Sequence, residues 1–158
     1  MSIHVDMRSP ACFCRAEWSM LIRCMVEAAS DMGMLPGQGH GPRGGENTSG
    51  CSPEALDVLL VVAGDAAVAA LNAERLGCTG PTNILSFPGS PGELGELFLS
   101  AETLERECVL YGQEPRRHAV RLLAHGMGHI MGFDHGADMY AFCEELEESC
   151  FPALAQHA

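Results

Sequence analysis

The 158-residue sequence contains no lysine, and all nine of its basic residues are arginine. Together with 21 acidic residues, this gives a net charge of −12 at pH 7. A protein that binds nucleic acid without specificity normally presents a basic surface, so the composition argues against such a binder. The acidic composition does not exclude an enzyme with a small basic cleft. Arginine suits bidentate contacts with phosphate, but the Ala- and Gly-rich composition favours codon bias as the cause of the missing lysine.

Long apolar runs and paired cysteines are also missing. No apolar stretch approaches the roughly 18 residues that a membrane-spanning helix needs, because Asp57 and Asp65 interrupt the longest candidate, 56–71. The N-terminus lacks the basic and then apolar segments of a signal peptide. The eight cysteines include no CxxC pair, and without a secretion signal reduced thiols are expected. We therefore expect a cytoplasmic protein with no membrane partner.

The length is that of one domain, and a hydrophobic content of 47% is enough for a core. The stretch 33–52 is dense in Gly and Pro and predicts a flexible surface loop, not a domain boundary. We therefore predict one domain over residues 1–158, with a layered α/β (α+β) fold and a small sheet. Periodicity and end signals predict helices over 15–31, 65–76, 101–111, 115–131 and 137–149, and strands or extended segments over 2–6, 58–63, 81–88 and 94–100.

The segment from His125 to His135 reads HGMGHIMGFDH. On a helix, His125 and His129 lie one turn apart on the same face, so both imidazoles can reach one ion. Gly132 can adopt a left-handed conformation and end the helix, which lets His135 supply a third nitrogen. Three protein ligands leave one zinc position open for water, as in catalytic sites. A lone histidine is usually an ordinary polar side chain, but three at this spacing predict one Zn²⁺ per chain.

The same spacing occurs in the metzincin peptidases, whose motif is HExxHxxGxxH. Those enzymes use the glutamate after the first histidine as the general base, and Gly126 occupies that position here. Glycine has no side chain to move a proton, so a peptidase of that type is not expected. Gly126 also costs the helix about 1 kcal/mol relative to alanine. This cost predicts a compensating reason, such as room for a substrate beside the metal.

The histidine segment resembles the signature HGxLHLxGYDH of the YbeY-type endoribonucleases, which are rRNA maturation factors. Two further segments carry the resemblance: 81–88, PTNILSFP, is similar to the family's PTNVLSFP, and 94–100, LGELFLS, to its LGDIxIS. Order and spacing agree from about Asp57 to the C-terminal helix. The resemblance implies a zincin-like fold with a mixed, roughly four-stranded sheet. It also implies a metal-dependent hydrolase that cuts single-stranded RNA and not DNA. This enzyme would mature the 3′ end of small-subunit rRNA and act in ribosome quality control. Its partner would be the small ribosomal subunit.

Two departures from the family pattern concern single residues. The family has an arginine before its PTN segment where an ungapped alignment places Leu76, and Arg75 lies one position earlier. Gly128 replaces a family leucine, which is expected to loosen the packing under the metal helix. Phosphodiester cleavage needs a cation near the developing charge. Arg121, one helical turn before His125, is the first candidate for this role, and Arg75 is the second.

Other polar residues have candidate roles at the site. Asp134 can orient an imidazole as a hydrogen-bond acceptor, accept a proton, or cap the turn. By resemblance, Asn83 and Ser86 line the cleft and hold RNA. Arg116 and Arg117 begin the metal helix and can extend a basic rim for the RNA backbone, or simply be a solvated helix start.

His118 lies two turns before His125, too far to complete a tetrahedral site easily, so it is expected to line the cleft or serve the structure. Three functions stay open. The first is a zinc-dependent, single-strand-specific endoribonuclease in which either a zinc-bound hydroxide or the RNA 2′-OH attacks. The second is a metallohydrolase of another substrate, which Gly126 disfavours. The third is a ribosome-associated assembly factor with a largely structural metal, which the displaced arginine and the acidic composition keep open.

Overall fold

The computed structural model describes residues 1–35, 57–90 and 93–155. Four strands form one mixed sheet in the order β1-β2-β4-β3. β1, β2 and β4 are parallel, and β3 runs antiparallel to β4 at the other edge. The predicted α/β fold with a small mixed sheet is therefore confirmed. The strand bounds are β1 Ser2–Met7, β2 Asp57–Ala63, β3 Ile84–Pro88 and β4 Glu93–Ser100.

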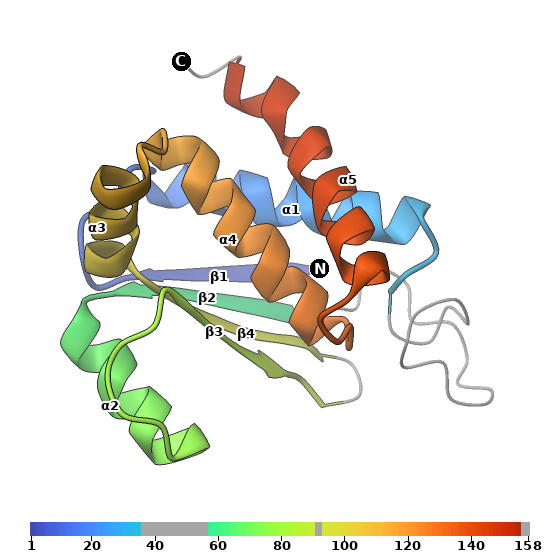
Figure 1. Ribbon diagram of the computed structural model, residues 1–158. Coiled ribbons are helices and arrows are strands. Elements are labelled where there is room, and N and C mark those ends of the chain that lie inside the picture. Colours follow the sequence, from blue (N-terminus) through green and yellow to red (C-terminus); the bar gives the residue numbers. More distant parts are fainter. Residues whose placement is uncertain (36–56, 91–92, 156–158) are drawn as a thin grey trace.

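Helices cover both faces of this sheet (Figure 1). Three of them, α1, α4 and α5, lie on one face, α2 lies on the other, and α3 lies at one end of the strands. The helix bounds are α1 Arg15–Asp31, α2 Asp65–Leu76, α3 Ala101–Tyr111, α4 Pro115–Ile130 and α5 Ala137–Ala155. The first three bounds agree with the prediction, and most of the predicted loop 33–52 lies outside the described residues.

The last helix is the main difference from the predicted elements. α5 continues past the expected end at Ser149 and contains Pro152. Phe151 and Leu154 pack against the core on this extension, and the guanidinium of Arg117 lies 4.7 Å from the centre of the Phe151 ring. Proline disfavours the interior of a helix, and these tertiary contacts stabilise the last turn of α5 in spite of it.

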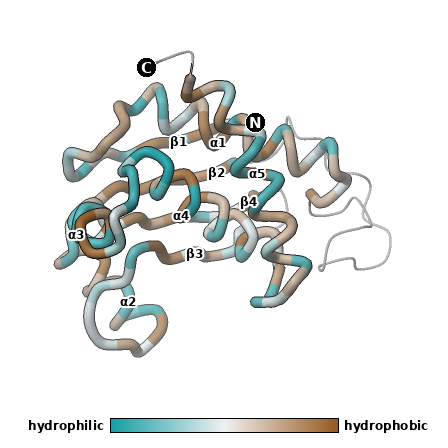
Figure 2. Tube along the Cα trace, turned by 45° about the horizontal axis from the view of Figure 1, so that its top comes forward, coloured by the Kyte–Doolittle hydropathy of each residue, from teal (hydrophilic) through white to brown (hydrophobic). Residues whose placement is uncertain are grey.

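β2 is buried on both faces, as its continuous apolar run predicts. Val58, Leu60 and Val62 belong to the core beneath α1 and α4, whereas Val61 and Ala63 belong to a second cluster that includes α2. This follows from the two-residue alternation of side chains in a strand. Figure 2 shows the hydrophobic residues running along the strands between the helical layers.

Asp65 ties together the helices that follow β2 and β4. Its carboxylate accepts hydrogen bonds from Ser100 Oγ and Thr103 Oγ1, both at 2.6 Å, and from Arg106 Nη1 at 2.9 Å. The hydrogen bonds from Ser100 and Thr103 are the main reason that the pKa of Asp65 is lowered to about 2. The carboxylate is therefore charged at neutral pH and fixes the start of α2 to the start of α3.

The seven cysteines in the described part of the chain are free thiols, and Cys51 lies outside it. Burial raises the pKa of Cys12 and of Cys150 to about 12, so both are neutral at physiological pH. None of the described helices combines the length and the apolar character needed to cross a bilayer.

Candidate metal centre

Three histidines converge at the C-terminal end of α4. His125 and His129 lie on the helix, and His135 follows in the turn before α5. Their candidate ligand nitrogens all lie within 4.8 Å of one another. Nε2 of His125 and Nε2 of His129 are 3.2 Å apart. Two nitrogens bound to one tetrahedral zinc at about 2.0–2.1 Å are about 3.3 Å apart, so this pair already has the spacing of two zinc ligands.

The turn after α4 positions the second and third histidines. Gly132 has a φ of 94°, a conformation that favours glycine, as predicted for the end of this helix. The backbone carbonyl of Phe133 lies 3.2 Å from Nδ1 of His129. A proton on Nδ1 is donated to this carbonyl, which leaves Nε2 free to face an ion. The carbonyl of Phe133 therefore orients His129, while the three roles considered for Asp134, whose side chain is exposed, stay predictions.

The local environment favours the neutral form of the first histidine. Burial lowers the pKa of His125, and the nearby His129 and His135 lower it further. Metal binding requires neutral imidazole, because a protonated ring has no free lone pair. The three residues therefore offer a donor set that can hold one metal ion, with zinc suited to three nitrogens and an open position.

Gly126 is where α4 comes closest to the sheet. A Cβ at this position would lie 2.8 Å from Ile84 Cδ1, 2.9 Å from Leu97 Cδ2 and 3.2 Å from Ser86 Oγ. Those atoms belong to β3 and β4 directly beneath the helix. Close packing of the helix on the sheet is therefore a reason for glycine here, and the room for substrate that the sequence suggests stays a prediction.

Gly128 lies on another side of α4, against α5. A Cβ there would lie 3.0 Å from Met139 Cε and 3.6 Å from Cys143 Sγ. Met139 is fully buried, so a methionine from α5 fills the space of the family leucine. The looser packing expected from Gly128 is not found, because the neighbouring helix compensates.

The two glycines give a matched test of this packing. Both Gly126→Ala and Gly128→Ala gain about 1 kcal/mol of helix propensity. At Gly126 the new methyl meets the buried ends of Ile84 and Leu97, and overpacking of this kind costs about 1–3 kcal/mol. At Gly128 it meets mainly Met139, a flexible side chain that can adjust. Urea unfolding is expected to find Gly128→Ala more stable than Gly126→Ala by about 1–2 kcal/mol. Equal stabilities, or the reverse order, would show that α4 has room over the sheet.

Arg121 lines the same cavity as His125, on the side of α4 that faces α5. Its Nη1 donates to Gln113 Oε1 at 3.0 Å, and its Nε lies 3.8 Å from Glu147 Oε2. The side chain is 54% exposed. Since a guanidinium carries five N–H donors, Arg121 keeps donors for a ligand beside the histidines.

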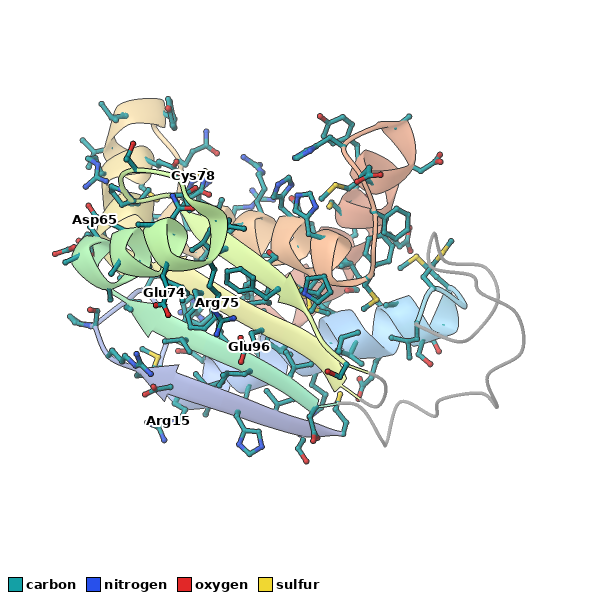
Figure 3. All side chains as sticks on the ribbon, turned by 90° about the horizontal axis from the view of Figure 1, so that it is seen from below. Arg15, Asp65, Glu74, Arg75, Cys78 and Glu96 are labelled. Atoms are coloured by element: carbon teal, nitrogen blue, oxygen red, sulfur yellow. The ribbon has the colours of Figure 1, made fainter. Side chains whose placement is uncertain are left out.

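Arg75 lies on the opposite face of the sheet (Figure 3). Its Nη1 donates to Glu96 Oε2 at 2.8 Å, and its guanidinium lies 4.6 Å from the centre of the Phe87 ring. Phe87 packs with the cluster under α2, whereas its neighbour Ser86 lies beneath Gly126 of α4. Because adjacent strand residues point to opposite faces, the sheet separates Arg75 from the histidines. Leu76, at the family's arginine position, is exposed.

The two polar residues of the PTNILSFP segment have different surroundings. Ser86 is half-buried on the α4 face, close to the turn that carries His125. The Asn83 side chain already has protein partners: Nδ2 donates to Glu107 Oε1 at 3.1 Å, and Oδ1 accepts from the Ile84 backbone at 2.7 Å. The other Glu107 oxygen lies 2.8 Å from His118 Nε2. Asn83, which precedes β3, is thus joined through Glu107 of α3 to His118 of α4, an arrangement that the sequence did not indicate for Glu107.

Arg116 and Arg117 point to other elements. Arg116 Nη2 donates to Glu17 Oε1 at 2.6 Å, and its guanidinium lies 4.6 Å from the centre of the Phe13 ring. Arg117 lies over Phe151. Both arginines thus connect the start of α4 to the regions of α1 and α5, and these contacts give no support to the predicted basic rim.

Fold and site together define a mixed α/β protein whose three-histidine cluster can hold one metal ion and lacks the glutamate of the peptidases. The sequence model of the family described as Endoribonuclease YbeY matches residues 46–151. The chain belongs to this family.

Individual relatives agree with that assignment. The chain is 48% identical over 118 residues to Endoribonuclease YbeY of Nitratidesulfovibrio vulgaris, and the match covers 61% of this chain and 73% of the relative. It is 43% identical over 122 residues to Endoribonuclease YbeY of Oleidesulfovibrio alaskensis, with 61% and 71% covered. The solution structure of TM1509 from Thermotoga maritima matches with a TM-score of 0.63 at 15% identity, over 98% of this chain and 93% of that one. This last likeness supports the fold alone.

Proposed function

We propose that this chain is a zinc-dependent endoribonuclease that cuts single-stranded RNA and acts in the maturation of the 3′ end of small-subunit rRNA and in ribosome quality control. The observation that carries the proposal is the convergence of His125, His129 and His135, with ligand nitrogens within 4.8 Å of one another. They lie inside the segment that matches the endoribonuclease family. Gly126 leaves no general base of the peptidase type, whereas phosphodiester cleavage can use the substrate's own 2′-OH.

Each residue of the site has a distinct part in this proposal. The three histidines hold the ion, and the Phe133 carbonyl fixes the ring of His129. A zinc ion bound there supplies a Lewis acid beside the phosphate. Arg121 donates hydrogen bonds to the phosphate oxygens as negative charge develops. The Ser86 hydroxyl, on the same face of the sheet, donates to a phosphate or ribose oxygen. Asp134 is exposed beside His135 and can accept a proton at the edge of the site.

A second candidate function rests on one observation. Leu76 stands at the family's arginine position and cannot hold an anion, and Arg75 is paired with Glu96 across the sheet from the histidines. A chain without that phosphate contact can act as an assembly factor on the small ribosomal subunit with a largely structural metal. The two functions differ in turnover, so catalysis decides between them.

The test uses the purified chain as isolated and after chelation and dialysis. Single-stranded RNA, double-stranded RNA, single-stranded DNA and a peptide library are each incubated with both samples. We expect cleavage of single-stranded RNA only, lost on chelation and restored by added zinc. No turnover together with retained binding to small subunits would select the assembly factor, and peptide cleavage would contradict both functions.

A further inference from the structure

A cavity of about 380 Å³ lies beside His125, between α4 and the first half of α5. Its lining residues are Arg121 and His125 from α4, and Tyr140, Cys143, Glu144 and Glu147 from α5. Because His125 is a proposed metal ligand, a substrate held at the metal would pass this cavity. The cavity is therefore placed to contact a group next to the reacting phosphate.

The aromatic ring of Tyr140 lines this cavity and is not part of the hydrophobic core. Its residue exposure is 62%. The neighbouring aromatic of α5, Phe142, is buried and stacks on Phe133 at a centroid distance of 4.7 Å. The first turn of α5 is fixed by a hydrogen bond from the Tyr140 backbone to the Gly136 carbonyl. An exposed aromatic held on a helix at the wall of a cavity suits stacking on a planar ligand, and nucleobases stack on such side chains whatever their identity.

On the α5 side the cavity carries acceptors, whereas Arg121 on the α4 side carries donors. Glu147 is 20% exposed and forms an ion pair with Arg121, whose Nε lies 3.8 Å from Glu147 Oε2; this single contact leaves the carboxylate further lone pairs. Glu144 adds a second, exposed carboxylate. The Cys143 thiol contacts the Ala124 carbonyl at 3.4 Å, and burial raises its pKa to about 11. The floor is thus a neutral thiol that adds no charge.

We propose that this cavity is a nucleobase subsite for the nucleotide next to the cleaved phosphate, and that it selects bases with an exocyclic amino group. This inference rests on the endoribonuclease function proposed above. Tyr140 stacks on the base, Glu147 accepts a hydrogen bond from the amino group, and Arg121 contacts the adjoining phosphate. Carboxylates only accept hydrogen bonds. Adenine and cytosine offer amino donors on the edge where uracil presents the O4 acceptor, and guanine carries an amino group at N2.

The test measures cleavage of end-labelled oligouridylates in which one central uridine is replaced by adenosine, cytidine or guanosine. With zinc-loaded wild-type protein, cleavage is expected to concentrate at a bond adjoining the replaced base, about tenfold above the uridine bonds. Tyr140→Ala should raise KM about tenfold with little change in kcat, because stacking of this strength contributes to binding. Tyr140→Phe keeps the ring and should restore most of the binding that Tyr140→Ala loses. Tyr111→Ala, which removes another exposed tyrosine from α3, is the matched control and should leave KM and kcat unchanged.

Glu147→Gln tests the selectivity separately. An amide can donate to uracil O4 as well as accept, so the preference for amino-bearing bases over uridine should fall to about twofold or less. Equal cleavage at every bond by wild-type protein, with Tyr140→Ala unchanged, would overturn the subsite and leave the endoribonuclease function standing.

Absence of cleavage would count against the endoribonuclease function, and binding then decides the subsite. Fluorescence anisotropy with the same oligonucleotides needs no catalysis. Tighter binding of the strands with an amino-bearing base, lost in Tyr140→Ala but kept in Tyr140→Phe, would support the subsite. Equal binding of all strands by wild-type and Tyr140→Ala protein would overturn it.

Discussion

Replacing His129 by alanine is expected to remove most of the bound zinc and to abolish metal-dependent RNA cleavage. His129 Nε2 lies 3.2 Å from His125 Nε2, so its loss leaves two imidazoles, of which His135 is exposed on the turn beyond the helix. A ligand that binds only the folded state stabilises it, so the melting temperature should fall together with the zinc content. Inductively coupled plasma mass spectrometry gives the zinc per chain, about one in wild type, and calorimetry gives the melting temperature.

His4→Ala is the matched control, because this exposed histidine lies on β1 and should change neither quantity. Chelated wild-type protein should melt close to His129→Ala, since both lack the ion. Unchanged zinc content in His129→Ala would refute the three-histidine assignment. A lower melting temperature with unchanged zinc would instead assign His129 to packing.

Arg121→Ala is expected to slow RNA cleavage on the order of a hundredfold, the usual effect of removing one charge-assisted contact worth ~3 kcal/mol at a transition state. Arg75→Ala should have a much smaller effect. Arg121 shares a cavity with His125, whereas Arg75 is paired with Glu96 at 2.8 Å and stacked on Phe87 on the other face of the sheet. Single-turnover rates of the zinc-loaded variants provide the comparison.

Zinc content should be normal in both arginine variants, which separates a contact with phosphate from a defect in metal binding. Arg121→Lys keeps the charge but loses the planar, forked donor arrangement, and should recover part of the rate. If Arg75→Ala abolishes cleavage while Arg121→Ala leaves it intact, the position of Arg121 beside His125 has no catalytic meaning. An arginine one place from the family position would then reach the phosphate after all.

Most of the fold could be predicted from the sequence because its elements carry strong local signals. The stripe of Trp18, Leu21 and Met25 marks α1, and Pro115 marks the start of α4. The end of α5 could not be predicted, because Pro152 is a local breaking signal and the contacts of Phe151 that outweigh it come from other elements. The strand order, with β4 between β2 and β3, is likewise set by long-range pairing.

The features of the site likewise divide into those that local sequence predicts and those that long-range contacts set. The helical spacing of His125 and His129 and the glycine at 132 are local features, so the sequence indicated the cluster that the structure brings together. The orienting acceptor of His129 is a backbone carbonyl, which no side-chain pattern can reveal. The separation of Arg75 from Arg121 depends on which face of the sheet α2 covers. The amide of Asn83 donates a hydrogen bond to Glu107, far away along the chain, which no local pattern indicates; its contact with RNA stays a prediction.

The contact of Gly126 with Ile84 and Leu97 also bears on how such enzymes diverge. A single nucleotide change can turn a glycine codon into a glutamate codon and would here create the HExxH motif of a metallopeptidase. The first side-chain carbon would already lie 2.8 Å from Ile84 Cδ1 and 2.9 Å from Leu97 Cδ2, so these side chains would have to move before the new carboxylate could serve a metal. That mutation alone would therefore not turn this site into a peptidase site, because the packing of α4 on the sheet would have to change with it.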